Sequence, residues 1–484
     1  MRSDRDTRAR RRAPALVAVT VAALLFHASS ARFGLSYLDD DVLAPTPASV
    51  AASGGVLGAL AHPYFPTGER DHAYYRPLVS ASFALDAVRG DGDPASFHVT
   101  NVALHALTGA ALLLLFESFG YATSVALFAA LVFVAHPALA GAVAWIPGRD
   151  DLMLGLFSVL AWLFFRRANA GGGPRERVLH GLCFGLALAS KETALALPCV
   201  LVLEGRLLDK RPWRELFALW PLAVWGVVTA LYVAVRGLVL GPALGLGGGA
   251  SGSFIDGLRG LLSGFGELVV PLALPVLAVP ADMPVALGFA ALAAFGAAWG
   301  WSGARRTVLG VALAASALFA APSLPALARL LLESRLYLPA VPLALAVAEL
   351  AARVRLPERS KLALGGFVLT LSAAATLRHV ALFRDRLVLA KAVVEGSPSS
   401  PLAHRNLGVA YQLRGESELA RTEYRRALAL DPDEPVAHNN LAVILMAEGR
   451  LPEAEVELRA ELARHPASAE AEKNLALVRR ALNR

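Results

Sequence analysis

Long apolar stretches alternate with short polar connections over residues 13–379 of this 484-residue chain. About 20 consecutive apolar residues are enough for a helix to cross the hydrocarbon core of a membrane. The pattern therefore predicts eleven membrane spans, at residues 13–31, 98–116, 121–138, 150–166, 177–193, 194–208, 216–239, 284–302, 306–323, 336–354 and 361–379. A further segment, 260–280, contains Pro271, Pro275 and Pro280, and we expect it to be re-entrant or interfacial. The fold class is predicted to be all-α, with a polytopic helical bundle.

The composition supports a membrane protein and excludes several soluble classes. Hydrophobic residues make up 56% of the chain and charged residues 18%, whereas soluble domains have nearer a quarter charged residues. The net charge of +7 could suggest a nucleic-acid partner, but the excess lies mainly in the first twelve residues and between apolar segments, so we expect none. The two cysteines, Cys183 and Cys199, provide neither a disulfide framework nor a metal site.

The positions of the positive charges predict the orientation in the membrane. Lys and Arg are enriched in cytoplasmic loops. With eleven spans, the basic clusters all lie on the same side as the arginine-rich N-terminus: Arg166–Arg167, Lys210–Arg211, Arg305–Arg306 and Arg353–Lys361. The N-terminus is therefore predicted to be cytoplasmic, and the loop 32–96 and everything after the last span extracytoplasmic. The first span reads as a retained signal anchor, with a cleaved signal peptide as the alternative.

The composition changes to polar, helical sequence after residue 390, where a repeat of 34 residues begins. Asn406, Asn440 and Asn474 are 34 residues apart, and this period is typical of tetratricopeptide (TPR) repeats. We therefore predict a membrane domain at 1–390 and a repeat domain at 391–484, with units at 401–434 and 435–468 and a capping helix at 469–484. Because about three units are usually needed for stability, we expect the repeats to lean on the membrane domain or a partner.

Three adjacent carboxylates, Asp39, Asp40 and Asp41, follow the first span in the stretch "YLDDDVL". Solvated charges at a helix exit are one interpretation. Adjacent carboxylates also raise one another's pKa unless a cation or a substrate shares the site, and a carboxylate tuned in this way can act as a general base.

Further polar residues are predicted at the same face of the membrane. Four short stretches carry them: Tyr75 and Arg76 lie in the first outer loop, Trp145, Arg149 and Asp150 at an outer turn, Lys191 and Glu192 at the next, and Arg335 and Tyr337 at a later one. His98 lies near the outer end of the second span, where Asn101 and His105 are expected to make interhelical hydrogen bonds. Cations beside carboxylates at a lipid boundary suit transfer from a lipid phosphate, because they stabilise charge on the departing group.

The order of these motifs resembles a known family. "LDDD", "YYRPLVSASFALD", "FVAHPALAGAVAWIPGRDDL", "LASKETALALP" and "ESRLYLP", followed by TPR repeats, are similar to the transmembrane-and-TPR-repeat family of GT-C glycosyltransferases, in its bacterial form. The resemblance implies a GT-C-like, protein O-mannosyltransferase-like enzyme that acts with inversion. It implies catalytic roles for Asp39 and Asp40 and basic residues at Arg76, Arg149, Lys191 and Arg335, which we interpret as ligands of the donor phosphate.

The sequence thus predicts transfer of a hexose, with mannose implied by the resemblance, from a polyprenyl-phosphate carrier to a hydroxyl of an exported protein at the bacterial inner membrane. The repeats would dock the protein acceptor. The remaining substrate-binding candidates are Asp41, Tyr75, His98, Trp145, Asp150, Glu192 and Tyr337. No motif indicates a cofactor or a metal, because Walker, HExxH, nucleophile-elbow and EF-hand patterns are all missing from the sequence. The alternatives are an envelope glycan or lipid as acceptor, and a non-catalytic membrane scaffold.

Overall fold

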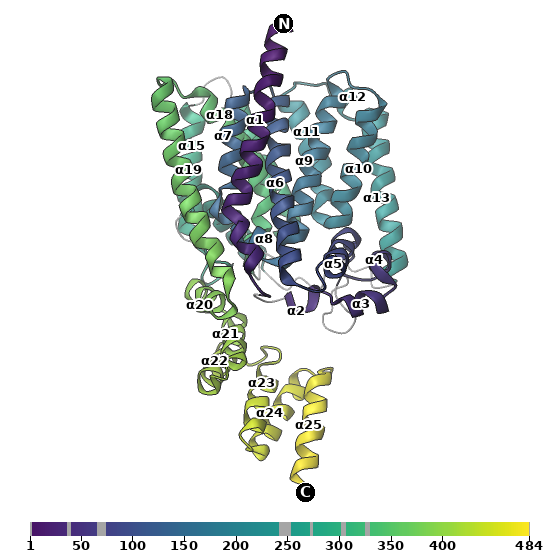
Figure 1. The fold of residues 1–484 in the computed structure, drawn as a ribbon, viewed down its shortest axis with the longest axis vertical. Helices are drawn as coiled ribbons and strands as arrows, with labels where there is room; N and C mark the ends of the chain where they lie inside the picture. Colours follow the sequence, from purple (N-terminus) through teal and green to yellow (C-terminus); the bar gives the residue numbers. More distant parts are fainter. Residues whose placement is uncertain are drawn as a thin grey trace. The chain divides into compact units, whose positions relative to one another are not determined.

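The chain folds into two compact units in the computed structural model (Figure 1). The first unit comprises Met1–Leu274 and Pro284–Arg384, and the second comprises Pro275–Met283 and Asp385–Arg484. The structure describes residues 2–35, 40–64, 74–241, 253–271, 274–301, 306–324 and 330–483, and the side chains of 2–11 and of 41–42 lie outside the description. Apart from the two-residue strands β1 (Leu277–Ala278) and β2 (Leu331–Leu332), the regular elements in this part of the chain are helices, which confirms the all-α class.

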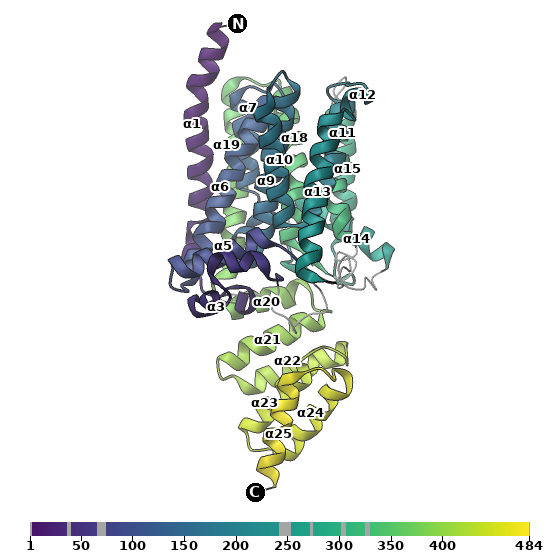
Figure 2. The ribbon, with the colours of Figure 1, turned by 90° about the vertical axis from the view of Figure 1, so that its right-hand side faces the viewer.

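The first unit is a bundle of long, roughly parallel helices (Figures 1 and 2). Every apolar segment expected to span the membrane contains one of them: α1 (Arg2–His27), α6 (Pro94–Ser118), α7 (Thr123–Val134), α9 (Arg149–Asn169), α10 (Pro174–Ser190), α11 (Leu197–Leu207), α13 (Leu219–Leu240), α15 (Val285–Trp301), α16 (Arg306–Ala320), α18 (Tyr337–Arg353) and α19 (Glu358–Val380). Six described helical stretches are long and apolar enough to cross a membrane, or seven if the pair Thr123–Val134 and Pro137–Ala144, bent by 58°, is one span. The chain is a multi-pass membrane protein, and the number of eleven spans stays a prediction.

Several predicted spans are shorter in the structure than the apolar runs suggested. The helix α11 has 11 residues and at 1.5 Å per residue extends only about 16 Å, roughly half a hydrocarbon core. It follows η5 (Glu192–Ala196), a tight 3-10 turn at the connection predicted between the spans 177–193 and 194–208. The turn expected at Lys191 and Glu192 is therefore present, and the helix that follows it is shorter than the predicted span.

The segment expected to be re-entrant or interfacial begins as the amphipathic helix α14 (Phe254–Val269). Its glycines Gly257, Gly260 and Gly264 are three and four residues apart, so they lie on one face of the helix, and all three are buried. A Cβ added at Gly266 would lie 2.5 Å from the backbone nitrogen of Gly288 in α15, so the two helices approach closely there. With 16 residues, α14 is too short for a full span.

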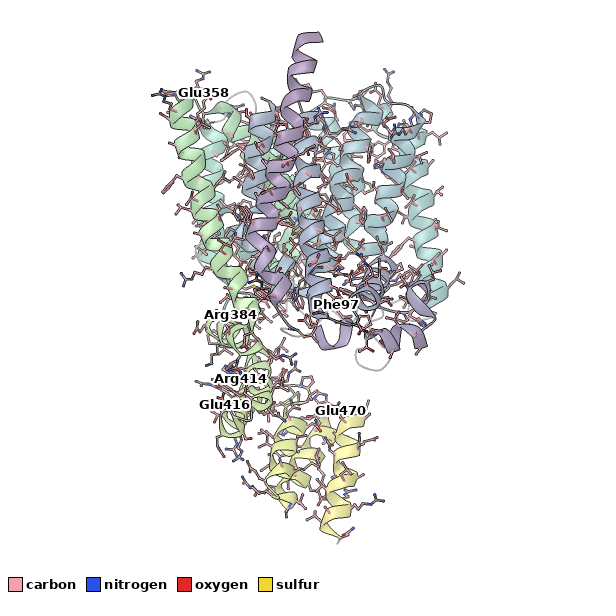
Figure 3. The ribbon with its side chains drawn as sticks, viewed as in Figure 1. Phe97, Glu358, Arg384, Arg414, Glu416 and Glu470 are labelled. Atoms are coloured by element: carbon pink, nitrogen blue, oxygen red, sulfur yellow. The ribbon has the colours of Figure 1, made fainter. Side chains whose placement is uncertain are left out.

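Short helices gather at one end of the bundle, where α5 and α6 meet (Figure 2). Those of the first loop are α2 (Asp40–Leu43), α3 (Pro47–Ala52), α4 (Gly55–Gly58), η2 (Ala59–Ala61) and α5 (Pro77–Arg89). The other short helices and turns of the unit are η1 (Ala28–Arg32), η3 (Pro137–Leu139), α8 (Ala140–Ala144), η4 (Ile146–Gly148), α12 (Trp213–Leu216), η7 (Ala321–Ser323), η8 (Glu333–Leu336) and η9 (Ala381–Arg384). Phe97 marks this end in Figure 3, and Glu358 marks the opposite one. We call them the loop end and the N-terminal end of the bundle.

The second unit contains helical hairpins whose contacts repeat every 34 residues. Its helices are α20 (Arg386–Gly396), α21 (Pro401–Leu413), α22 (Ser417–Leu430), α23 (Ala437–Ala447), α24 (Leu451–Arg464) and α25 (Ala469–Leu482). His404 Nδ1 lies 2.6 Å from Glu423 Oε2, and His438 Nδ1 lies 2.6 Å from Glu457 Oε2, which are the equivalent positions of the next hairpin. Gly408 is required for close packing, because a Cβ there would lie 2.6 Å from the Tyr424 ring.

A short segment from the middle of the chain completes the second unit. The Oγ of Ser397 accepts a hydrogen bond from the backbone of Val279 at 3.1 Å and donates one to Asp282 Oδ2 at 3.0 Å. The same carboxylate accepts from the backbone of Ser399. The second unit thus includes residues that follow α14 in the sequence. That the repeats lean on the membrane domain or a partner stays a prediction.

Candidate functional site

Arg76 joins three segments that are far apart in the sequence. It directly precedes Pro77 at the start of α5, and its side chain is buried. Its Nη1 donates to Asp150 Oδ2 at 2.5 Å and its Nη2 to Glu192 Oε1 at 3.2 Å. The guanidinium lies 4.7 Å from the ring centroid of Tyr74. Burial alone would lower the pKa of Arg76, but the carboxylates of Glu192 and Asp150 outweigh it and raise the pKa well above its usual value.

Lys191 and the first turn of α9 extend this arrangement. The Nζ of Lys191 donates to Asp151 Oδ1 at 2.6 Å and lies 3.2 Å from Asp150 Oδ2. Asp150 and Asp151 can begin α9 because negative charge is stabilised at a helix N-terminus. All three side chains are buried. We call Arg76, Asp150, Asp151, Lys191 and Glu192 the ion network, and it confirms that three of the expected outer connections lie together.

Arg335 lies in η8, just before α18, and its charge is not directly paired. Its Nη1 donates to the backbone carbonyl of Leu330 at 2.7 Å, and it makes no ion pair with any residue that the structure describes. Its charge interacts electrostatically with those of Asp151, Asp150 and Arg76, so Arg335 faces the ion network. Of the four cations predicted to bind phosphate, Arg76, Arg149 and Lys191 pair with described carboxylates, whereas Arg335 does not.

An apolar cavity of about 310 Å³ opens beside Arg335. It lies between α14, α15, α16 and α18, and Arg335 is the single charged side chain among the described residues that line it. Those residues are Leu258, Gly260, Leu261, Leu262, Gly264, Phe265, Leu268, Leu292, Leu313, Ser316, Ala317, Ala320, Ser323, Arg335, Leu336 and Pro339. A cation at the edge of an apolar cavity suits an amphiphile with an anionic head and a hydrocarbon tail.

The acidic motif is described only in part. Asp39 lies outside the described residues, and so does the side chain of Asp41. Asp40 begins α2 and is fully buried. The helix α2 packs against η4, the turn that leads directly into Arg149 and Asp150. The acidic motif therefore lies close to the start of α9, which carries Asp150 and Asp151 of the ion network.

The surroundings of Arg149 differ from those expected of a ligand of the donor phosphate. Its side chain is fully buried, and the residues it contacts lie on α5 and α6. Its Nη1 lies 2.7 Å from Asp86 Oδ2, its Nε donates to Asn101 Oδ1 at 2.9 Å and its Nη2 to the carbonyl of Phe97 at 2.7 Å. The guanidinium also lies over the Phe83 ring. With its donors used within the protein, Arg149 holds three helices together instead of facing a ligand.

Four other predicted ligand residues lie in packed surroundings. Tyr337 is fully buried, and its hydroxyl lies 2.8 Å from His105 Nδ1. Tyr75 is buried and donates to the carbonyl of Leu60, and burial raises the pKa of its hydroxyl. The buried ring of His98 lies 3.4 Å from the carbonyl of Gly34.

Trp145 contributes its backbone carbonyl, which accepts from Asn101 Nδ2 at 3.0 Å. Asn101 and His105 thus make the interhelical contacts expected of them.

Two groups at the loop end were given no role by the sequence reasoning. Asp86 is the ionic partner of Arg149, and its place in "SASFALD", one turn of helix after Ser82, was the available signal. Glu333 Oε2 lies 2.6 Å from His379 Nε2. The buried Glu267 is close enough to Glu333 for the two carboxyl groups to interact electrostatically. Because Glu267 belongs to the amphipathic helix α14, no span-end pattern could have indicated it. Across the described ranges, no three His, Cys, Asp or Glu side chains are arranged to hold a metal ion.

Comparisons with known proteins agree with this arrangement. The chain is 37% identical over 150 residues to the human protein O-mannosyl-transferase TMTC2, a match that covers 28% of this chain and 17% of that protein. It is 31% identical over 172 residues to human TMTC1, which covers 34% of this chain and 20% of that protein. The chain resembles the protein O-mannosyltransferases. These matches span a fifth or less of the length of the curated relatives.

A family model and a solved structure extend the resemblance. A model described as "TPR repeat" matches residues 413–449. The crystal structure of ArnT from Cupriavidus metallidurans, bound to undecaprenyl phosphate, aligns with a TM-score of 0.50 at 14% identity, covering 92% of this chain and 79% of that one. At this identity the likeness shows the fold. The resemblance to TPR-containing protein O-mannosyltransferases and the GT-C-like fold are thereby confirmed.

Proposed function

We propose that this protein is a membrane glycosyltransferase that transfers a hexose, by resemblance mannose, from a polyprenyl-phosphate-linked donor to a hydroxyl of an exported protein. The observation that carries the proposal is the position of Arg335 at the edge of an apolar cavity and facing the ion network. This arrangement complements a donor whose phosphate follows a hydrocarbon chain. It is supported by the likeness of the fold to ArnT, a protein solved with undecaprenyl phosphate.

The residues near Arg335 would divide the work of binding the donor. The guanidinium of Arg335 would bind the phosphate through charge-assisted hydrogen bonds, and the first isoprene units would enter the cavity between α14 and α16. Arg76 and Lys191 would stabilise the negative charge that develops on the leaving phosphate, held in place by Asp150 and Asp151. Arg149 would act only by positioning the start of α9.

The chemical step would be a displacement with inversion at the anomeric carbon. A carboxylate of the acidic motif, Asp39 or Asp40, would take the proton of the acceptor hydroxyl as its oxygen forms the new glycosidic bond. The bond between the anomeric carbon and the phosphate oxygen would break, and polyprenyl phosphate would leave with both bonding electrons. This scheme uses side chains alone and assigns no role to a cofactor or metal.

The proposed location follows from the positive charges. Arg166, Arg167 and Arg211 lie at the N-terminal end of the bundle, which we assign to the cytoplasm of a bacterial cell. The loop end, with the ion network and the acidic motif, then faces outward across the inner membrane. The second unit follows the last predicted span in the sequence, so we assign it to the extracytoplasmic side, where it would dock an exported protein acceptor.

The test is transfer of labelled hexose from synthetic polyprenyl phosphate sugars to membrane-fraction proteins. We would compare the wild type with Asp39→Asn/Asp40→Asn at matched expression. Loss of about 10²-fold or more is expected when a general base is removed. The control is Asp91→Asn in the α5–α6 turn, an exposed carboxylate at the same end.

Label that appears in a glycan or lipid would replace the protein acceptor with one of these. Equal transfer by the wild type and the double variant would refute the assignment of the base, and no transfer with any donor would favour a non-catalytic scaffold.

A further inference from the structure

A second cavity, lined mainly by polar residues, lies at the N-terminal end of the bundle, opposite the candidate active site. It encloses about 410 Å³ between the ends of α1, α6 and α9 and the connection that follows α11. The residues lining it are Arg12, Leu114, Glu117, Ser118, Arg166, Arg167, Asn169, Ala170, Asp209 and Arg211. Four arginines face one glutamate and one aspartate, so we call it the basic cavity.

Two of these arginines are already engaged in ion pairs. The Nε of Arg12 donates to Glu117 Oε2 at 2.7 Å. Arg166 pairs with the buried Glu204, and its Nε donates to Ser118 Oγ at 3.1 Å. These contacts tie α1, α6, α9 and α11 together and form the walls of the cavity.

The other two arginines have no ion pair with any part of the chain that is described. Arg211 donates to the backbone carbonyl of Asn169 at 2.8 Å, and its charge is attracted by that of Glu204 without a direct ion pair. Arg167 is exposed and lies 5.8 Å from the Phe164 ring centroid. Its charge is repelled by that of Arg12 and attracted by those of Glu176 and Glu117. Arginine side chains that line one cavity repel one another, and an anion bound between them would offset this repulsion.

The surroundings select the kind of anion. Leu114 lines the basic cavity, so its wall is apolar on the side that leads toward the membrane core. On α1, further from the N-terminus than Arg12, Val17 and Leu25 are 62% and 67% exposed and belong to a predicted span that lipid chains would cover. Guanidinium groups at a headgroup level next to apolar helix surfaces are suited to a lipid phosphate.

We propose that the basic cavity binds the phosphate headgroup of an anionic phospholipid from the leaflet at the N-terminal end of the bundle. Arg167 and Arg211 would donate to the phosphate oxygens, and the acyl chains would lie along Leu114 and α1. The site would fasten α1 to α6 and α9 in one orientation. This inference is independent of the proposed transfer reaction, because it uses none of the residues at the loop end.

The test uses the full-length protein in nanodiscs of phosphatidylcholine, with and without phosphatidylglycerol. We would measure the thermal unfolding midpoint and count bound lipids by native mass spectrometry. The variant is Arg167→Gln/Arg211→Gln, and the matched control is Arg175→Gln/Arg214→Gln, which removes two exposed charges from the same end outside the cavity. Should the double variant not fold, Arg167→Gln alone removes an exposed side chain that has no described hydrogen bond.

We expect phosphatidylglycerol to raise the midpoint of the wild type and of the control, and this increase to be lost in the double variant. The affinity for phosphatidylglycerol should fall about tenfold for each guanidinium contact removed, because the loss of one charge-assisted hydrogen bond weakens binding by about this factor. Equal responses of wild type and double variant would overturn the proposal. An equal increase with inorganic phosphate alone would overturn the lipid assignment in favour of a soluble anion.

Discussion

The guanidinium of Arg76 and the carboxylate of Asp150 form a hydrogen bond of 2.5 Å although 74 residues separate them in the sequence. This bond joins the first outer loop to the start of α9, and Asp150 also lies next to Lys191. A buried carboxylate between two cations is compensated twice, so the ion network can remain charged inside the protein. The remaining cation nearby, Arg335, is then available to an anionic ligand.

Replacing Arg335 with Gln should weaken donor binding with little effect on folding. Its one described hydrogen bond is to a backbone carbonyl, and the loss of a charge-assisted contact should raise the KM for the polyprenyl-phosphate sugar about tenfold. Steady-state kinetics at varied donor concentration would measure this. Arg378→Gln, an exposed arginine near the loop end of α19, is the control. An unchanged KM in Arg335→Gln would remove Arg335 from the donor site.

Arg149 should matter for stability more than for donor affinity. Arg149→Met leaves Asp86 buried without its ionic partner, which should reduce the free energy of unfolding by about 3–5 kcal/mol. Thermal unfolding in detergent would detect the change, with the exposed Arg89→Met as control. Adding Asp86→Asn to Arg149→Met should restore part of the loss, because the uncompensated charge is then gone. A stable single variant with a raised donor KM would instead return Arg149 to the phosphate site.

Filling the apolar cavity should discriminate between donors of different chain length. Ala317 lines the cavity on α16, and Ala317→Phe would occupy space proposed for the first isoprene units. We expect the KM for long-chain donors to rise about tenfold, as expected when about 1.4 kcal/mol of apolar contact is lost. A donor with a very short chain should be much less affected. Ala294→Phe on the exposed face of α15 is the matched control, and an equal effect of both substitutions would contradict the proposed tail site.

The second unit should lose stability at low pH through Asp385, the N-cap of α20. Desolvation raises the pKa of this carboxyl, but the backbone N–H of Val388, the guanidinium of Arg414 and the backbone N–H of Leu387 outweigh it and hold the pKa below its usual value. A carboxyl with a lowered pKa in the folded state stabilises that state above the unfolded pKa, near 3.9. This stabilisation is lost as the pH falls through the folded pKa.

Amide hydrogen exchange of α20, corrected for intrinsic rates, would follow this loss between pH 6 and about pH 3. Asp385→Asn keeps a good N-cap and should remove the pH dependence, whereas Asp385→Ala should lower protection at every pH by about 1 kcal/mol. A pH dependence retained in Asp385→Asn would show that another group is responsible.

Local sequence patterns were sufficient for the helices and the repeats. Each predicted apolar run contains a helix because the burial of apolar side chains and the satisfaction of backbone hydrogen bonds depend on neighbouring residues. The 34-residue period likewise appears in the structure as equivalent contacts, such as His404 with Glu423 and His438 with Glu457. The turn at Lys191 and Glu192 was also predicted, but the short length of α11 after it was not, because hydropathy alone does not mark where a helix begins and ends within an apolar run.

The sequence by itself predicted that charged residues of four connections belong to one end of a helical bundle, because apolar length and positive charge predict topology. Only the tertiary structure decided which of these charges neutralise one another. Arg76 and Lys191 pair with carboxylates, Arg149 is enclosed by α5 and α6, and Arg335 borders an apolar cavity. The physical reason is that a side chain's role depends on partners a few ångströms away, and the partners here are brought together from distant parts of the chain by helix packing.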